Sequence, residues 1–221
     1  MIKKITIMSM LVSSLLYGDS DIPKQKGFFV GLDVSYMNAT TRYDKSGAGI
    51  TTSSYSSKDY LVPVSVRLGY QYYFTRIYAR INNEKSYQDN KKERYKLDSK
   101  AYEINADYIP VIYTSTEKDW TIRALFGVGL GANKSALTYY DARLDSIGTN
   151  LEAILDKDTQ WNMEYGLQMG AMAEFDFGLN VELAYRYRSG LMSEFSDTDG
   201  ANEVTFKLLS SEIYLGVNYL F

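Results

Sequence analysis

The sequence predicts an all-β protein, folded as an eight-stranded antiparallel up-and-down transmembrane β-barrel. Three observations support this fold class. Apolar and polar side chains alternate with a period of two over eight segments. The chain holds 21 Tyr and 16 Gly, a mixture that suits strands with one face near a membrane interface. Beyond the first 18 residues, no uncharged apolar run approaches the roughly 20 residues that a spanning helix needs.

The start of the chain has the three-part order of a signal peptide. Two lysines are followed by an apolar stretch over 5–16 and by the small Gly18. A short buried helix is the weaker alternative, and we expect cleavage after Gly18 or after Ser20. The expected organisation is a signal peptide over 1–18, a short periplasmic tail over 19–26 and a β-barrel over 27–221.

Eight segments carry the strand period, one after another along the chain. The first alternates apolar side chains from Phe28 to Tyr36, and the second does so most cleanly, from Val62 to Phe74. Pro110 removes one backbone donor from the fourth segment, so we expect it near a strand end. The expected strands cover 27–37, 60–74, 76–82, 100–113, 120–131, 161–175, 179–187 and a last segment that ends at Phe221.

The connections between these segments alternate in length. Short ones are expected at Thr75, 114–119 and 176–178, and the others are long and polar. In membrane barrels the long loops face outward and the short turns face the periplasm. We therefore expect four exposed loops, over 38–59, 83–99, 132–160 and 188–203.

The polar face of the strands indicates which side points inward. A soluble barrel of the lipocalin type has the same period with its apolar face inside. However, the polar face carries glycines such as Gly69, Gly127 and Gly216, and a small barrel's crowded interior gains from missing side chains. We therefore expect the apolar face to contact lipid. Aromatic belts are expected at Tyr72, Phe74, Trp120, Phe175, Tyr219 and Phe221, and at Tyr36, Tyr60, Trp161, Tyr185 and Tyr187.

The polar face also carries charges of both signs at mid-strand. A lone charge in a narrow lumen is costly, so we expect these side chains to interlock as hydrogen-bonded ion pairs. On a soluble barrel they would instead be ordinary solvated charges. The expected lumen network consists of Arg67, Arg80, Glu103, Asp107, Arg123, Glu164, Glu182, Arg186 and Glu212, with Asp33 from the first segment.

Several classes of function are disfavoured by composition. Without Cys and His, the chain has no disulfide, thiolate metal site, lipidated cysteine or His-dependent catalytic base. A net charge of −3 without a compensating basic patch lacks the footprint of nucleic-acid binding. Acid pairs such as Glu103 and Asp107 near arginines are more often structural than catalytic. We expect no enzyme, no cofactor, no metal and no nucleic-acid partner.

The loops and the lumen carry weaker hypotheses. Residues 144–155 have helical apolar spacing, which predicts a short helix capping the barrel mouth in preference to a docking surface. The acidic spacing over 196–203 resembles a calcium loop but lacks its full ligand set, so we expect a solvated turn. Basic residues over 91–96 alternate with acids, so attraction to lipopolysaccharide there is expected to be weak. Eight strands leave room only for side chains, so we expect no continuous pore.

The end of the chain carries a resemblance to a known family. Residues 213–221 read IYLGVNYLF and end on a carboxy-terminal Phe. This segment resembles the assembly signal of bacterial outer-membrane barrels, and 27–221 is similar to the small OmpA/OmpX-type barrels. The resemblance implies insertion by the barrel assembly machinery, with Tyr219 and Phe221 as the assembly signal. No peptidoglycan-binding domain follows the barrel in this sequence, so wall anchoring is not expected.

These observations combine into one expected function. We expect an integral protein of the bacterial outer membrane with a packed polar lumen and long exposed loops, serving a structural or adhesion-like surface role. Expected partners are outer-membrane lipids and lipopolysaccharide, the assembly machinery, and a host or surface ligand bound by the loops. The alternative is a secreted, soluble, lipocalin-like barrel that binds an apolar ligand.

Overall fold

The structure is a computed structural model that describes residues 26–47, 50–90, 93–117, 119–141, 155–190, 193–196 and 202–221. Side chains are described over 26–40, 60–83, 98–117, 119–136, 161–190 and 209–221. The expected signal peptide lies outside these residues. So do the expected helix, apart from Leu155, and most of the acidic loop at 196–203.

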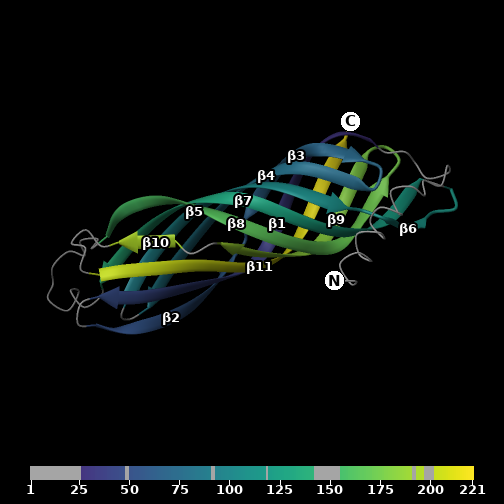
Figure 1. Ribbon diagram of the computed structural model, residues 1–221. Helices are drawn as coiled ribbons and strands as arrows, with labels where there is room; N and C mark the ends of the chain where they lie inside the picture. The colour runs from purple at the N-terminus through teal and green to yellow at the C-terminus, as the bar shows by residue number, and fades with distance from the viewer. Residues whose placement is uncertain are drawn as a thin grey trace, which may run out of the picture.

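The described chain forms one antiparallel sheet (Figure 1). Its strands are β1 (Lys26–Gly47), β2 (Ile50–Leu61), β3 (Val64–Tyr72), β4 (Thr75–Asn90), β5 (Glu93–Tyr108), β6 (Val111–Thr114), β7 (Trp120–Asp141), β8 (Leu155–Phe175), β9 (Leu179–Gly190), β10 (Ser193–Ser196) and β11 (Asn202–Leu220). Three of these strands are extensions of another strand at the same position in the ring. β2 and β3 both pair with β1, β5 and β6 both pair with β7, and β9 and β10 both pair with β11. The barrel therefore has eight strand positions around its ring.

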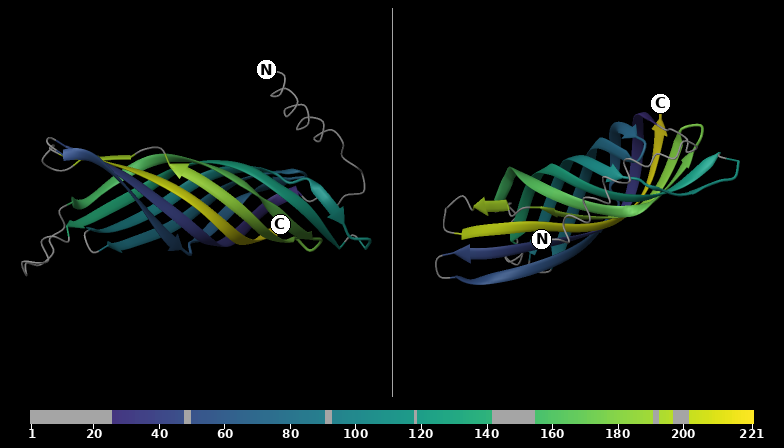
Figure 2. Two further views of the ribbon diagram at one scale, coloured as in Figure 1. Left: turned by 90° about the horizontal axis from the view of Figure 1, so that it is seen from below. Right: turned by 45° about the vertical axis from the view of Figure 1, so that its right-hand side comes forward.

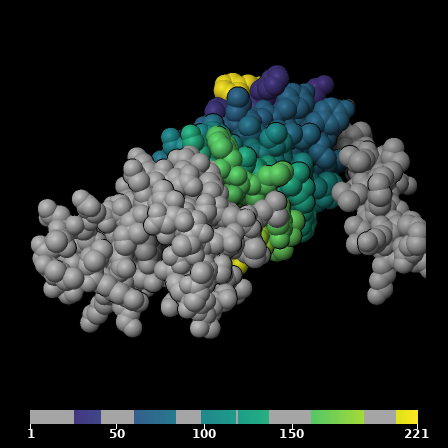
Figure 3. Space-filling view, turned by 60° about the vertical axis from the view of Figure 1, so that its left-hand side comes forward, coloured from purple at the N-terminus to yellow at the C-terminus, as the bar shows by residue number. Residues whose placement is uncertain are grey.

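The sheet closes on itself through β1. This strand pairs with β3 on one side and with β11 on the other, from Phe29↔Leu220 to Gly47↔Asn202. Figure 3 shows the C-terminal end of the chain in yellow beside the purple residues of β1. Each of the eight strand positions consequently has a hydrogen-bonded neighbour on both sides. The backbone N–H and C=O groups are thereby paired, as the interior of a membrane requires. The fold is the closed, eight-stranded antiparallel barrel that the sequence predicts.

Two prolines interrupt the strands, because proline has no backbone donor. Pro63 separates β2 from β3, so the expected strand over 60–74 is divided. Pro110 follows the end of β5, which confirms the expectation for this residue. The carbonyl groups of both prolines still accept hydrogen bonds. The carbonyl of Pro63 accepts from the amide of Ser35 at 3.1 Å, and the carbonyl of Pro110 accepts from the amide of Ala124 at 2.9 Å.

The four segments expected as long loops are mostly strand, so that expectation was wrong. The β1–β2 pairing extends to Gly47↔Ile50, and the β4–β5 pairing to Asn90↔Glu93. β7 has 22 residues and β8 has 21, about twice the roughly 10 that a tilted transmembrane strand needs. Figure 2 shows these long hairpins running together toward one end of the barrel.

The opposite end of the barrel has short turns. The β3–β4 connection is Tyr73 and Phe74, so the turn expected at Thr75 lies just before that residue, which begins β4. Tyr73 has a φ of 49° in the left-handed region, and the hydroxyl of Thr75 donates to the carbonyl of Tyr72 at 3.1 Å. The β8–β9 turn ends on Gly178, whose φ of 91° suits glycine.

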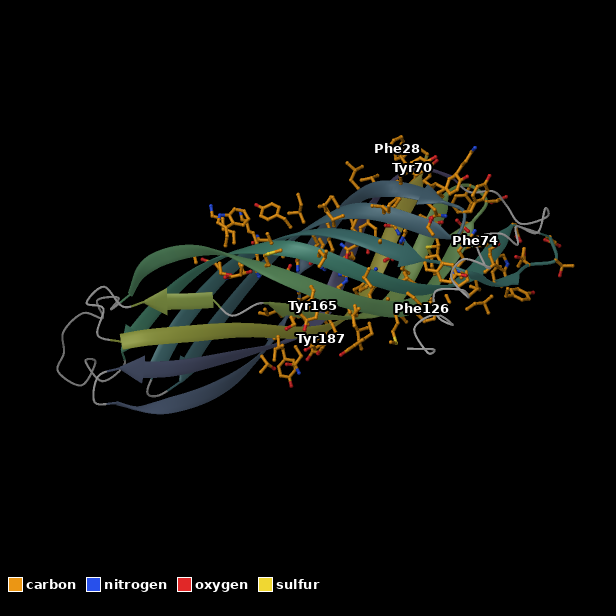
Figure 4. All side chains as sticks on the ribbon, viewed as in Figure 1. Phe28, Tyr70, Phe74, Phe126, Tyr165 and Tyr187 are labelled. Atoms are coloured by element: carbon orange, nitrogen blue, oxygen red, sulfur yellow. The ribbon has the colours of Figure 1, made fainter. Side chains whose placement is uncertain are left out.

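Successive side chains point alternately into the barrel and away from it. On β1, Leu32 is 56% exposed and the adjacent Asp33 is 1% exposed. The same orientation holds around the ring, where large apolar side chains face outward (Figure 4). This arrangement is the reverse of a lipocalin-like barrel, so the soluble alternative is not supported. In the described part of the chain, no helix is long and apolar enough to cross a membrane.

Candidate functional site: the lumen and the outer rim

Charged side chains of both signs fill the lumen. Because the strand period is two, each strand delivers its polar residues to the same side of the sheet. The described interior buries six arginines and seven carboxylates, so one negative charge is in excess. These residues are Asp33, Arg67, Arg76, Arg80, Glu103, Asp107, Arg123, Glu164, Glu174, Glu182, Arg186, Arg188 and Glu212.

An arginine–glutamate pair crosses the middle of the lumen. Arg67 on β3 donates to Glu182 on β9 at 2.8 Å, and its Nε lies 3.2 Å from Asp33 on β1. The two strands β1 and β11 separate β3 from β9 in the ring. Gly216 on β11 leaves the space for this reach, because a Cβ there would meet the guanidinium of Arg67. The missing side chain of Gly216 thus allows the pair to form.

A second group of charges lies beside the first. The guanidinium of Arg80 reaches Glu103 at 2.9 Å, Glu212 at 3.2 Å and Asp33 at 3.4 Å. Arg186 donates to the same carboxylate of Glu212 at 2.8 Å. Asp33 joins both groups, since it also faces Arg67. The ion pairs therefore form a connected network, in which Asp33 and Glu212 each face arginines from two different strands.

Aromatic and amide side chains fill the space between these charges. The Arg186 guanidinium lies 4.3 Å from the centre of the Tyr214 ring and donates to Gln168 at 2.8 Å. Gln168 in turn donates to the hydroxyl of Tyr78 at 2.8 Å. Such cation–π contacts are strengthened by the exclusion of water. The Arg186 guanidinium is thus contacted on its face by an aromatic ring and at its edge by an amide.

The short-turn end of the lumen has its own ion pairs. Arg76 donates to Asp107 at 2.6 Å and also to Glu182. Arg123 is ion-paired with Glu174, and its second nitrogen donates to the carbonyl of Ile109 at 3.1 Å. These contacts join β4, β5, β7, β8 and β9 across the interior at this end. A core of Ile109, Leu125, Met172, Ala184 and Tyr214 is also buried inside the barrel.

The lumen remains polar toward the long hairpins. Arg188 on β9 lies 3.4 Å from Glu103 and 3.8 Å from Glu164. The hydroxyl of Ser99 donates to Asn133 at 2.6 Å. This part of the interior therefore contains smaller side chains as well as charges.

The structure places all nine expected lumen residues in the interior. Ion pairs and hydrogen bonds connect eight of them, through Arg76 and Arg188 among others, whereas Arg123 pairs separately with Glu174. Sequence reasoning missed three charged members: Arg76, Glu174 and Arg188. The first two follow the same period as their neighbours on β4 and β8, so alternation alone could have identified them. Arg188 was assigned to a loop.

Nothing in the described interior is arranged for metal chemistry. Among the described residues, no group of three or more acidic side chains could hold a metal ion. The carboxylates are instead matched with arginines, which have several donors in a fixed plane. Several of these ion pairs connect strands that face each other across the interior.

Aromatic side chains mark both borders of the apolar exterior. Near the short turns, Tyr113 and Trp120 lie 5.3 Å apart and the rings of Tyr219 and Phe221 lie 5.1 Å apart. Toward the long hairpins, Tyr36 stacks on Tyr60 at 5.8 Å. Tyr and Trp are enriched at membrane–water interfaces. Figure 4 shows Phe28 and Tyr70 beside each other on the exterior, with ring centres 5.1 Å apart.

The exterior also carries two lysines at the hairpin-side border. Lys100 on β5 and Lys134 on β7 are directly opposite each other in the register, and both are exposed. Trp161 is the next residue along this row, on β8, and its ring centre lies 5.7 Å from the ammonium group of Lys134. The same ring lies 5.8 Å from that of Tyr102. We call these two lysines and two aromatic residues the outer rim patch.

Solved structures of outer-membrane proteins have a similar fold. The crystal structure of Neisserial surface protein A is 17% identical, covering 88% of this chain and 97% of its own, with a TM-score of 0.51. That of the outer membrane protein OprG from Pseudomonas aeruginosa is 11% identical, covering 91% of this chain and all of its own, with a TM-score of 0.50. No family model and no curated protein matches the chain. These likenesses at low identity show the fold alone.

The geometry then indicates where the barrel lies. An apolar exterior between aromatic belts, around a polar interior, is the arrangement of a barrel that spans a bilayer. Bacteria use closed antiparallel barrels of this kind in the outer membrane, with short turns on the periplasmic side. The chain is therefore a small, eight-stranded β-barrel of the bacterial outer membrane.

Proposed function

We propose that this barrel is a non-conducting anchor that holds polar β-hairpins above the outer membrane for interaction with a surface ligand. The observation that carries the proposal is the length of the strands. β7 and β8 exceed the membrane-spanning length by about 10 residues each. At about 3.4 Å per residue and a tilt near 40°, this excess corresponds to about 25 Å above the bilayer.

The packed lumen supports the same proposal. Six buried arginines with their carboxylate partners occupy the space that a channel would require. Eight-stranded barrels are just wide enough for side chains to fill. The network of ion pairs connects strands across the interior, and we expect it to stiffen the part of the barrel that carries the hairpins. The expected partner of the hairpins is a host or surface ligand.

A shortened hairpin tests the proposal. Asn83 and Lys100 are directly opposite each other, so residues 84–99 can be replaced by Asn-Gly, a two-residue turn that suits a hairpin. We expect this variant to fold and to reach the outer membrane, because the removed residues lie beyond the apolar band. Adhesion of cells to extracellular matrix or to host cells should fall severalfold.

The matched control inserts a short epitope between Asn90 and Glu93, where the β4–β5 hairpin connects. Antibody should label intact cells that carry it, since the hairpin is expected outside. An epitope that is accessible only after the outer membrane is broken would overturn the orientation. Unchanged adhesion after shortening of each hairpin in turn would overturn the surface role.

A further inference from the structure

We propose that the outer rim patch binds a phosphate group of lipopolysaccharide, through Lys100 and Lys134. The site would take the bisphosphorylated glycolipid of the outer leaflet, known as lipid A. This inference rests on the position of the barrel in the outer membrane. It does not depend on the proposed role of the hairpins.

The first observation is the pairing of like charges. Lys100 and Lys134 are directly opposite each other on adjacent antiparallel strands, where Cβ atoms are about 4.5–5.5 Å apart. Both side chains are exposed and share the outer face. Like charges in this position destabilise a sheet. A phosphate between the two ammonium groups would replace that repulsion with two charge-assisted contacts.

The second observation is that neither lysine has a carboxylate partner among the described side chains. Among the ion pairs of the described residues, none includes Lys100 or Lys134. Along β5 on the same face, the next acid is Asp98, which is half-buried and has an interaction of its own. On the other side of Lys100 in the row lies the neutral Asn83. The pair is thus available to an external anion.

The third observation is the depth of the pair in the membrane. Trp161 and Tyr102 lie against each other on the exterior, where aromatic rings take up the level of the lipid headgroups. The ring of Trp161 also holds the ammonium group of Lys134 by a cation–π contact at 5.7 Å. Leu130 and Met163, further toward the short turns, are more than 60% exposed on the apolar surface. The lysines therefore border the surface that acyl chains would cover.

The experiment measures lipid binding to the refolded full chain in a nonionic detergent without phosphate groups, by native mass spectrometry. The probes are bisphosphorylated lipid A, lipid A without phosphates, and inorganic phosphate. The variants are Lys100→Gln, Lys134→Gln and both together. Lys26→Gln is the matched control, because Lys26 is exposed at the opposite end of the barrel.

We expect lipid A to bind about fivefold more weakly for each lysine removed, and about 25-fold more weakly for both. The Lys26→Gln control should bind as the unchanged protein does. Equal binding by the double variant, or equal binding of lipid A without phosphates, would overturn the site. Inorganic phosphate binding as tightly as lipid A would overturn the assignment to a lipid.

A second measurement separates a lipid site from a structural role. In neutral detergent, Lys100→Gln should leave the urea midpoint of unfolding unchanged or raise it, because it removes a repulsion and keeps the contact between Lys134 and Trp161. In bilayers that contain lipid A, the same change should lower the midpoint. A shift of the same sign in both media would contradict the proposal. The hairpin-shortened variant keeps both lysines, so it should retain lipid A binding even if the surface role fails.

Discussion

Arg67 and Glu182 are ion-paired at 2.8 Å across the lumen, although 115 residues separate them in the chain. The guanidinium reaches its partner over Gly216, and Glu182 also accepts from Arg76 and Asn218. One carboxylate thus compensates two arginines from neighbouring strands. The stability of the barrel should depend strongly on this residue.

Glu182→Gln should lower the free energy of unfolding by about 3–5 kcal/mol, because it removes the carboxylate that two buried guanidinium groups share and leaves Arg67 only Asp33 and Arg76 only Asp107. Unfolding in urea, followed by tryptophan fluorescence in detergent, would measure the change. Glu117→Gln in an exposed turn is the control and should have little effect. The double change with Arg67→Gln should cost less than the sum of the two single changes. Strict additivity would contradict direct coupling.

Gly170→Ala should destabilise the barrel by about 1–3 kcal/mol through overpacking. A Cβ at this position would collide with the backbone of Ala184 on β9, which has no flexible end to move aside. Gly166→Ala, four residues away on the same strand and face, meets atoms only at 3.4 Å and should cost much less. Urea midpoints of the two variants provide the comparison, and equal midpoints would contradict the close approach at Gly170.

The purified barrel should show no stable conductance steps in a planar bilayer. Its described lumen is crossed by Arg67, Arg80, Arg123 and Arg186, each held by carboxylates or by main-chain carbonyls. Replacing Arg67 and Glu182 together by Ala should admit water and raise ion leakage, which single-channel recording would detect. Regular open-channel steps from the unchanged protein would contradict the packed lumen.

Phe221→Ala should reduce the amount of protein in the outer membrane severalfold, because the terminal Phe is expected to act in assembly. The ring is 74% exposed, so its loss should barely change the unfolding free energy of protein refolded in detergent. Boiled and unboiled gel samples of membrane extracts would quantify folded barrel. Phe177→Ala, also exposed at this end, is the control. A matching loss in the control would argue against a specific signal.

The alternation of apolar and polar side chains was sufficient to predict the strands within the membrane, because one face of each strand there contacts lipid and the other faces the lumen. Beyond the membrane both faces are polar, and the pattern that separates strand from loop disappears. The ladder nevertheless continues past Thr40↔Lys58 and Lys85↔Asp98. The Thr and Tyr content of these segments was a signal of strand that hydrophobic periodicity does not measure.

The lumen residues were predicted from their position on the polar face of the strands. Which of these residues pair with each other was not predicted. Arg67 and Glu182 meet because β3 and β9 lie on opposite sides of β1 and β11, which depends on closure of the ring. Arg188 continues the inward period of Glu182, Ala184 and Arg186, and it was missed because the expected strand ended at Tyr187. The period is lost only at the next residue, Ser189, which is also buried.

Closure through β1 and β11 also means that the barrel has no first strand in any geometric sense. The amide of Phe221 donates to the carbonyl of Phe28 at 2.8 Å, so the two ends of the barrel domain are adjacent. Joining them by a short linker and cutting the chain between Tyr73 and Phe74 would give a circular permutant with the same ring of neighbours. Such a chain would keep its native cross-strand pairs but end on a different strand. The folded ring is cyclic, and only the biosynthetic order of the polypeptide distinguishes its strands.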